Sequence, residues 1–140
     1  MNARDVMTPD PACCTTETSL HEVAKLMLQL DCGEIPVLDK ANTPVGVVTD
    51  RDIVCRAVAK GLNPLTLSAG DVMSSPALTA RASDDLEAVE LLMQTRQIRR
   101  IPVVGDDGGI CGIVSLADVV RRDGAAQARD VVREVSAPAR

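Results

Sequence analysis

Aromatic residues are absent from this chain of 140 residues, which has no phenylalanine, tyrosine or tryptophan. Hydrophobic residues still make up 46% of the sequence, which is enough for a core, and the length suits one compact domain. A planar ligand would therefore be held by aliphatic side chains, proline, methionine, arginine or the backbone, because no ring is available for stacking.

The residues of several catalytic and binding classes are also missing. Histidine occurs once, as His21, and the sequence has no G-x-x-x-x-G-K-[ST] loop, no H-E-x-x-H motif and no nucleophile elbow. No nucleophile is clustered with a base, so we do not expect an enzyme. The formal net charge of −5 argues against general nucleic-acid binding, which depends on basic residues that neutralise phosphates.

Long apolar runs are absent as well. The sequence has no run of about 18 apolar residues and no signal peptide at residues 1–5, so we expect a soluble, cytoplasmic protein that binds no membrane. The five cysteines form no paired C-x-x-C motif, which fits reduced thiols better than a disulfide framework. Cys13 and Cys14 could be small apolar residues or, with Cys32 or Cys55, a metal or redox sensor.

The main positive feature is a repeat with an offset of 66 residues. The matching segments are Asp5-Val6-Met7 and Asp71-Val72-Met73, Leu20 and Leu86, Ile35-Pro36-Val37 and Ile101-Pro102-Val103, Gly46 and Gly112, Thr49 and Ser115, and Asp52 and Asp118. Because no insertion disturbs the spacing, we expect one supersecondary unit twice, at 1–66 and 67–124, sharing one core. Residues 125–140 lie outside the repeat and should form a short helix or a tail.

Each repeat is predicted to contain the same elements in the same order. In the first copy these are a helical turn at 3–7, a strand at 12–15, a helix that starts with a capping box at 19–22, strands at 35–38 and 45–48, and a helix at 51–60. Pro36 indicates an edge strand or an irregular start. The apolar face of the long helix should comprise Leu20, Val23, Ala24, Met27 and Leu28. The predicted fold class is α+β, with two βαββα-like repeats.

The junction between the last strand and the last helix of each copy carries a hydroxyl–carboxylate pair. A hydroxyl ends the strand, at Thr49 or Ser115, and a carboxylate follows three residues later, at Asp52 or Asp118. The N-terminus of a helix favours a phosphate, and a carboxylate there can accept hydrogen bonds from the vicinal hydroxyls of a ribose. The four positions are therefore predicted to bind a nucleoside phosphate, although the same residues would also serve simply to cap the helices.

These motifs together resemble the cystathionine β-synthase (CBS) domain, and the tandem resembles a Bateman module. The resemblance rests on segments 5–8, 35–37 and 46–52 and their copies, and it covers about residues 3–123. The chain is similar to small stand-alone bacterial two-CBS proteins of the hypoxic-response type. This implies an α/β-type CBS fold packed with pseudo-twofold symmetry, and a non-catalytic regulatory module that binds an adenosyl ligand, such as AMP, ADP or ATP, in clefts between the repeats.

The resemblance also implies roles for individual residues. Asp52 and Asp118 would hold ribose hydroxyls, and Thr49 and Ser115 would contact phosphate or sugar. The adenine pockets would be lined by the two Ile-Pro pairs, which are Ile35, Pro36, Ile101 and Pro102. The adenine nucleotide would act as a regulatory ligand, and no cofactor would be required.

The two copies differ where the resemblance implies a basic phosphate contact. Arg99 and Arg100 of the second copy correspond to Gly33 and Glu34 of the first. Arg51, inside the first hydroxyl–carboxylate motif, has no arginine counterpart in the second copy. Because arginine binds phosphate and glutamate repels it, we expect two sites of unequal affinity or one dominant ligand.

Two alternatives to the ligand-binding module remain open. One is an interaction protein that has the CBS fold but no nucleotide affinity, and the other is the thiol-based redox or metal sensor. For the leading interpretation we expect a homodimer formed through exposed helices and a downstream protein that responds to the ligand-bound state. The retained hydroxyl–carboxylate pairs favour ligand binding, whereas Glu34 favours the interaction protein.

Overall fold

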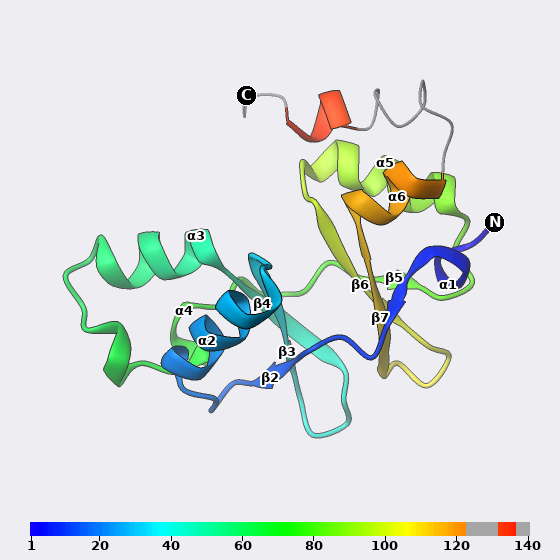
Figure 1. Ribbon diagram of the computed structural model, residues 1–140. Coiled ribbons are helices and arrows are strands. Elements are labelled where there is room, and N and C mark those ends of the chain that lie inside the picture. The colour runs from blue at the N-terminus through cyan, green and yellow to red at the C-terminus, as the bar shows by residue number, and fades with distance from the viewer. Residues whose placement is uncertain (123–131, 137–140) are drawn as a thin grey trace. The chain divides into compact units, whose positions relative to one another are not determined.

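The computed structural model describes residues 1–122 and 132–136 of the chain (Figure 1). The chain divides into two compact units, which we call the central unit, Ala12–Leu78, and the terminal unit, Met1–Pro11 with the chain from Thr79 onward. Each unit contains a sheet and helices, so the predicted α+β class is confirmed. Within the described ranges, no helix has the length and apolar character needed to cross a membrane.

The central unit is built on a three-stranded sheet in the order β2-β3-β4. β3 (Glu34–Leu38) and β4 (Pro44–Thr49) form an antiparallel hairpin, and the short β2 (Cys14–Thr15) lies parallel to β3. The helical elements of this unit are α2 (Leu20–Leu30), α3 (Asp50–Ile53), its π-helical continuation η1 (Val54–Val58), the 3-10 turn η2 (Pro64–Thr66) and α4 (Ala69–Val72). The strands, α2, α3 with η1, and α4 lie close to their predicted positions, whereas η2 was not predicted.

The terminal unit contains a four-stranded sheet in the order β1-β7-β6-β5. Its strands are β1 (Thr8–Pro9), β5 (Ala80–Arg81), β6 (Arg100–Val104) and β7 (Ile110–Ser115). Its helices are α1 (Ala3–Val6), α5 (Leu86–Arg96) and α6 (Leu116–Arg122). Residues 132–135 are helical, and the rest of the predicted C-terminal helix or tail lies outside the described residues.

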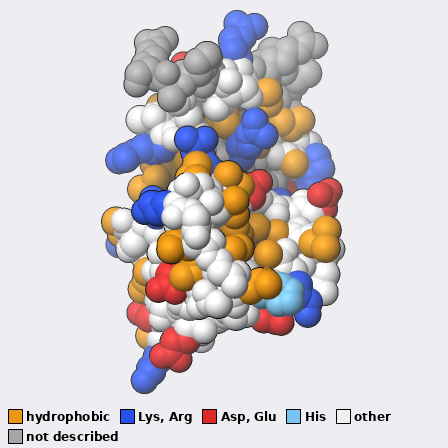
Figure 2. Space-filling model, turned by 90° about the vertical axis from the view of Figure 1, so that its left-hand side faces the viewer, with side chains coloured by type: hydrophobic (Ala, Val, Ile, Leu, Met, Phe, Trp, Pro, Cys, Tyr) orange, Lys and Arg blue, Asp and Glu red, His pale blue; other side chains and the backbone are white. Residues whose placement is uncertain are grey.

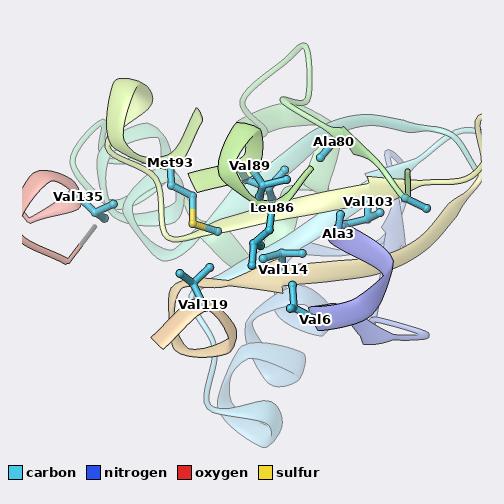
Figure 3. Packing of buried hydrophobic residues seen from close by; sticks show 12 residues of the cluster. Ala3, Val6, Ala80, Leu86, Val89, Met93, Val103, Val114, Val119 and Val135 are labelled. Carbon is cyan, nitrogen blue, oxygen red and sulfur yellow. The ribbon is translucent and has the colours of Figure 1, made fainter. Parts of the chain in front are cut away.

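The buried apolar residues form two clusters, one in each unit, so the prediction of one shared core is wrong. In the terminal unit, side chains from α1, α5 and α6 meet those of β6 and β7, as Figure 3 shows. Val135 joins this cluster from the C-terminal segment. Each cluster includes residues from the other sequence repeat. Ala3 and Val6 belong to the cluster of the terminal unit, and Ala69 and Val72 belong to that of the central unit.

That exchange involves the Asp-Val-Met segments. In the terminal unit, Thr8 follows the first of these segments and pairs with Ile113 of β7. In the central unit, Ser74 follows the second segment and pairs with Val47 of β4. The compact units are therefore not the sequence segments 1–66 and 67–124. These repeat boundaries remain a prediction about the sequence.

The α2 helix is less buried than its pattern predicts. Leu20, Val23 and Met27 are buried, but Leu28 is 83% exposed and Ala24 is also exposed. The buried stripe is therefore narrower than the apolar pattern, and the predictions for Ala24 and Leu28 are wrong. At the helix start, Ser19 Oγ accepts a hydrogen bond from the Glu22 N–H at 3.1 Å, as a capping box requires of the serine.

Pro36 is in the middle strand of its sheet, yet the pairing around it explains why proline is tolerated. In the described residues, β2 pairs with β3 at Val37 and Leu38. At Pro36 the strand therefore has β4 as its neighbour on one side, through Val47, and an unpaired edge on the other. Proline has no N–H to donate and is accepted at such a position.

Candidate functional site

The first hydroxyl–carboxylate pair, Thr49 and Asp52, forms a closed capping box where β4 leads into α3. The Asp52 N–H donates to Thr49 Oγ1 at 3.0 Å, and the Thr49 N–H donates to Asp52 Oδ2 at 3.0 Å. Asp52 is only 7% exposed. Its second oxygen, Oδ1, accepts a hydrogen bond from the Ser74 hydroxyl at 3.0 Å and lies 3.9 Å from Arg56 Nε. We call Thr49 and Asp52 the first frame.

The second pair, Ser115 and Asp118, repeats this geometry where β7 leads into α6. The Ser115 N–H donates to Asp118 Oδ2 at 2.9 Å, and the Asp118 N–H donates to Ser115 Oγ at 3.1 Å. Asp118 is 3% exposed, and its Oδ1 forms an ion pair with the guanidinium of Arg121. We call Ser115 and Asp118 the second frame.

Both frames therefore cap their helices, which is the simpler of the two roles predicted from the sequence. In each carboxylate, however, the capping uses Oδ2, while Oδ1 is bonded to a side chain that could move away. A carboxylate oxygen has two lone pairs and can accept a further hydrogen bond. A frame thus holds a buried carboxylate in a fixed orientation and leaves Oδ1 able to accept hydroxyl donors.

The start of α3 is already occupied by protein acceptors. The Asp50 N–H donates to the Gly33 carbonyl at 3.0 Å, and the Arg51 N–H donates to Asp50 Oδ1 at 2.8 Å. With the Asp52 N–H bound to Thr49, the first three N–H groups of α3 are all satisfied within the protein. A phosphate at the first frame would therefore depend on side chains and not on these backbone donors.

The arginines singled out in the second repeat lie beside the second frame. Arg100 begins β6 and stands directly opposite Ser115 in the β6–β7 ladder. The carbonyl of the exposed Arg99 accepts a hydrogen bond from the Leu116 N–H at 2.7 Å, at the start of α6. Arg51 lies in the first turn of α3, next to Asp52, and is exposed.

The four residues of the Ile-Pro pairs are all buried in the middle strands of their sheets. Ile35 belongs to the apolar cluster of the central unit and Ile101 to that of the terminal unit. Pro36 and Pro102 are also buried. Their proposed role as walls of adenine pockets stays a prediction.

Three residues at the frames were not found by sequence reasoning. Arg56 Nη1 donates to the carbonyl oxygens of Val72 at 3.0 Å and Met73 at 2.7 Å, besides facing Asp52. Arg56 and Arg121 follow their aspartates by four and three residues, a helical spacing that could have indicated these ion pairs. Ser74 is 22 residues from Asp52, and no local pattern predicts that contact.

The adjacent thiols of Cys13 and Cys14 hold their protons more tightly than ordinary cysteines do. Burial raises the pKa of Cys13 to about 11, and burial together with the charge of Cys13 raises the pKa of Cys14 to about 11. Because the thiolate is the form that binds metals and reacts with oxidants, a raised pKa disfavours both reactions. Among residues 1–122 and 132–136, no three or more His, Cys, Asp or Glu side chains are grouped so that they could hold a metal ion.

Comparison with known proteins identifies the family. The model of the CBS domain matches residues 3–58 and again residues 69–124. The chain therefore belongs to the CBS domain family and carries this domain as a tandem pair, as its motifs predicted.

Related sequences include both uncharacterised and named proteins. The uncharacterised protein MK0525 of Methanopyrus kandleri is 35% identical over 118 residues, which cover 84% of this chain but only 58% of that protein. Hypoxic response protein 1 of Mycobacterium tuberculosis is 32% identical over 119 residues, covering 85% of this chain and 82% of that protein. The match to Hypoxic response protein 1 thus extends over most of both chains, whereas this chain spans little more than half of MK0525.

Solved CBS pairs share the fold. Hypoxic Response Protein I, solved with two coordinated zinc ions, is 31% identical with a TM-score of 0.81, covering 89% of this chain and 100% of that one. CBSX2, solved in complex with AMP, is 30% identical with a TM-score of 0.75 and coverage of 91% and 98%. The CBS pair of MJ0100, solved with 5′-methylthioadenosine and S-adenosyl-L-methionine, is 25% identical with a TM-score of 0.75 and coverage of 86% and 94%.

Proposed function

We propose that this CBS pair is a non-catalytic regulatory module that binds an adenosyl ligand, such as AMP, ADP or ATP, at the two frames. The observation that carries the proposal is the duplicated buried carboxylate, Asp52 or Asp118, whose Oδ2 is fixed by a capping box while Oδ1 faces a replaceable partner. The complexes of related CBS pairs with AMP and with S-adenosyl-L-methionine support this class of ligand.

The binding mode follows from the free acceptor capacity of Oδ1. The vicinal hydroxyls of a ribose donate to Oδ1 of the carboxylate, and the protein partner either shares that oxygen or moves away. At Asp52 this partner is the Ser74 hydroxyl, and Ser74 is also held by two backbone hydrogen bonds to Val47, of 2.8 and 2.9 Å. A ligand that replaces this hydroxyl releases one of the contacts that hold the Ser74 segment on β4, and a partner protein can detect the change.

A thermal-shift titration of the full chain tests the proposal. The ligands are adenosine, AMP, ADP, ATP, NAD, S-adenosylmethionine and cyclic dinucleotides, and one present at 100 times its dissociation constant should stabilise the protein by about 2.7 kcal/mol. Asp52→Asn and Asp118→Asn keep an oxygen for the cap but remove the charge, so each should weaken binding at its own frame.

Asp71→Asn is the matched control for these two variants. Asp71 closes the same kind of capping box with Ser68 at the start of α4, but it is exposed and lies outside both frames. Its replacement should leave the ligand-induced shift unchanged. If no ligand stabilises the wild-type protein, or if the Asp71 variant loses the shift as strongly as the frame variants do, the proposal is wrong.

We also propose that the module acts as a homodimer through an apolar face of the central unit. Val54, Val58 and Leu62 recur at every fourth position and are 56%, 56% and 48% exposed. Leu65 and Leu28 are exposed in the same unit, and hydrophobic side chains gather on the face seen in Figure 2. Exposed apolar side chains of this kind favour association, because burying them removes apolar area from water.

Sedimentation velocity of the wild-type chain and of Val58→Glu tests the dimer. The wild-type protein should sediment as a dimer and the variant as a monomer, with Lys60→Glu as a control for the change of charge on an exposed residue nearby. A wild-type monomer at all concentrations would contradict the homodimer. The same apolar face is what favours the second candidate function, an interaction protein without ligand, should no adenosyl compound bind.

A further inference from the structure

We infer that the two frames select adenosyl ligands of different charge. The second frame takes an adenosyl ligand with a chain of phosphates, and the first frame takes one without phosphate, either neutral or carrying a sulfonium. This inference rests on the proposed function, because it names the ligand classes for the same two frames. It follows from an inversion of charge at equivalent positions of the two sheets.

The first difference in charge is at the residue that lies opposite the frame hydroxyl in each hairpin. Glu34 is directly opposite Thr49 in the β3–β4 ladder, and Arg100 is directly opposite Ser115 in the β6–β7 ladder. Directly opposed residues of an antiparallel pair project from the same face of the sheet, with Cβ atoms about 5 Å apart. A carboxylate therefore accompanies the hydroxyl of the first frame, and a guanidinium accompanies that of the second.

The first residue of each helix continues the same inversion. Asp50 begins α3, and its carboxylate lies so close to Gly33 that a Cβ on this glycine would be 3.0 Å from Asp50 Oδ2. The equivalent of Asp50 is Leu116, which begins α6 and brings no negative charge. The equivalent of Gly33 is Arg99, which is exposed at the start of α6. The first frame thus has two nearby carboxylates, those of Glu34 and Asp50. The second frame has two nearby arginines instead, Arg99 and Arg100.

The arginines next to the two aspartates also differ in what they can do for a ligand. At the first frame, Arg56 donates to the carbonyls of Val72 and Met73, so its guanidinium is committed to the backbone. At the second frame, Arg121 is 71% exposed and pairs with Asp118 Oδ1. When ribose hydroxyls take that oxygen, the Arg121 guanidinium can turn to the phosphates and remain paired with an anion.

These charges separate the ligand classes by ordinary electrostatics. A phosphate chain at the second frame meets Arg99, Arg100 and Arg121, and guanidinium–phosphate hydrogen bonds are among the strongest that side chains form. The same chain at the first frame meets the carboxylates of Glu34 and Asp50, which repel it. Besides the committed Arg56, it meets a single exposed guanidinium, that of Arg51, in place of three. A neutral nucleoside or a sulfonium cation avoids this repulsion, so these ligands suit the first frame better than a phosphate chain does.

Isothermal titration calorimetry with adenosine, ATP and S-adenosylmethionine, in magnesium-free buffer, tests the inference. Each frame is observed separately in the full chain by weakening the other, so Asp52→Asn reports the second frame and Asp118→Asn the first. In the Asp52→Asn protein, ATP should bind at least about tenfold more tightly than adenosine, which corresponds to one charged hydrogen bond. In the Asp118→Asn protein, adenosine and S-adenosylmethionine should both bind more tightly than ATP.

Charge-reversal variants then locate the cause. Arg100→Glu in the Asp52→Asn protein should remove the preference for ATP without changing the affinity for adenosine, and Glu34→Arg in the Asp118→Asn protein should create such a preference. The matched control is Arg81→Glu, because Arg81 is exposed in the same unit and pairs with Val104, at the opposite end of β6 from Arg100. Circular dichroism checks that each variant is folded, and Arg100→Gln replaces Arg100→Glu if the latter does not fold.

The possible outcomes are distinguishable. Equal ATP-to-adenosine preference at the two frames, or a preference that Arg100→Glu and Arg81→Glu reduce equally, would overturn the charge selection while leaving adenosyl binding intact. If neither frame binds adenosine, ATP or S-adenosylmethionine, the proposed function fails and this inference fails with it. Opposite preferences that reverse with the substitutions at Arg100 and Glu34 would support it.

Discussion

Replacing Gly46 or Gly112 by alanine should destabilise the protein, but a second substitution should relieve only one of the two losses. A Cβ on Gly112 would overlap Met7 Sδ and lie 2.8 Å from Met7 Cγ, which are atoms of a flexible side chain, and its nearest backbone atom, the Thr8 carbonyl oxygen, would be 3.0 Å away. A Cβ on Gly46 would lie 2.7 Å from the carbonyl oxygen of Ser74. That oxygen is a backbone atom and accepts a hydrogen bond of 2.9 Å from the Val47 N–H.

The expected magnitudes follow from the atoms that are met. Overpacking a well-filled site costs about 1–3 kcal/mol, and both glycine variants should lose stability in this range. Met7→Ala removes both methionine atoms that the new Cβ of Gly112→Ala would meet, so the pair should show a favourable coupling of about 1–2 kcal/mol. Met73→Ala cannot move the Ser74 carbonyl, so its coupling with Gly46→Ala should stay below about 0.5 kcal/mol.

Urea unfolding followed by circular dichroism at 222 nm measures these differences, since the chain has no aromatic residue for fluorescence. Two double-mutant cycles are needed, one for each glycine–methionine pair. Equal coupling in the two cycles would refute the reasoning, because it would mean that the Ser74 carbonyl yields as easily as a methionine side chain. Unchanged midpoints for both single glycine variants would show that the Asp-Val-Met segments do not pack on the hairpins as described.

Further predictions concern the caps and the cysteines. Asp118→Ala should lower the free energy of unfolding by about 1–3 kcal/mol, because the Ser115 N–H loses its acceptor, whereas Asp118→Asn should cost less than about 1 kcal/mol in the same urea titration. Arg56→Ala should cost about 1 kcal/mol and speed amide hydrogen exchange in α4, whose end carries the carbonyls that Arg56 binds; unchanged exchange there would contradict this. The raised pKa values of Cys13 and Cys14 mean that the folded state holds these protons more tightly than the unfolded state. Their contribution to stability should therefore be complete below about pH 9 and be lost as the pH rises to about 11, as urea midpoints across this range would show, and substituting both cysteines by serine should flatten the decline.

The local elements were predictable because their signals lie within a few residues of one another. The capping boxes, the hairpin turns and the 66-residue offset of Thr49 and Asp52 from Ser115 and Asp118 can all be read along the chain. These patterns predicted where β4 and β7 lead into helices, and the structure places α3 and α6 there. They also predicted the hydroxyl–carboxylate pairs, since a capping box joins residues three positions apart.

The burial of particular side chains was predicted less well. The pattern of α2 favoured a buried Leu28, but this side chain is exposed because the helix is covered only along its Leu20–Val23–Met27 stripe. Periodicity shows which residues share a helix face, and it does not show how wide the covering surface is. The prediction of one shared core was wrong for a related reason. The repeat pattern does not show which segment packs against which sheet.

The amino-acid sequence alone set the repeat, the family resemblance and the two hydroxyl–carboxylate pairs, because each depends on residue type and on short spacing. The tertiary structure decided that the segment after each Asp-Val-Met motif pairs with the hairpin of the other repeat, and that Ser74 bonds to Asp52. It also decided that Glu34 and Arg100 stand opposite the frame hydroxyls. These contacts join residues far apart along the chain, and their register depends on packing that no local pattern encodes.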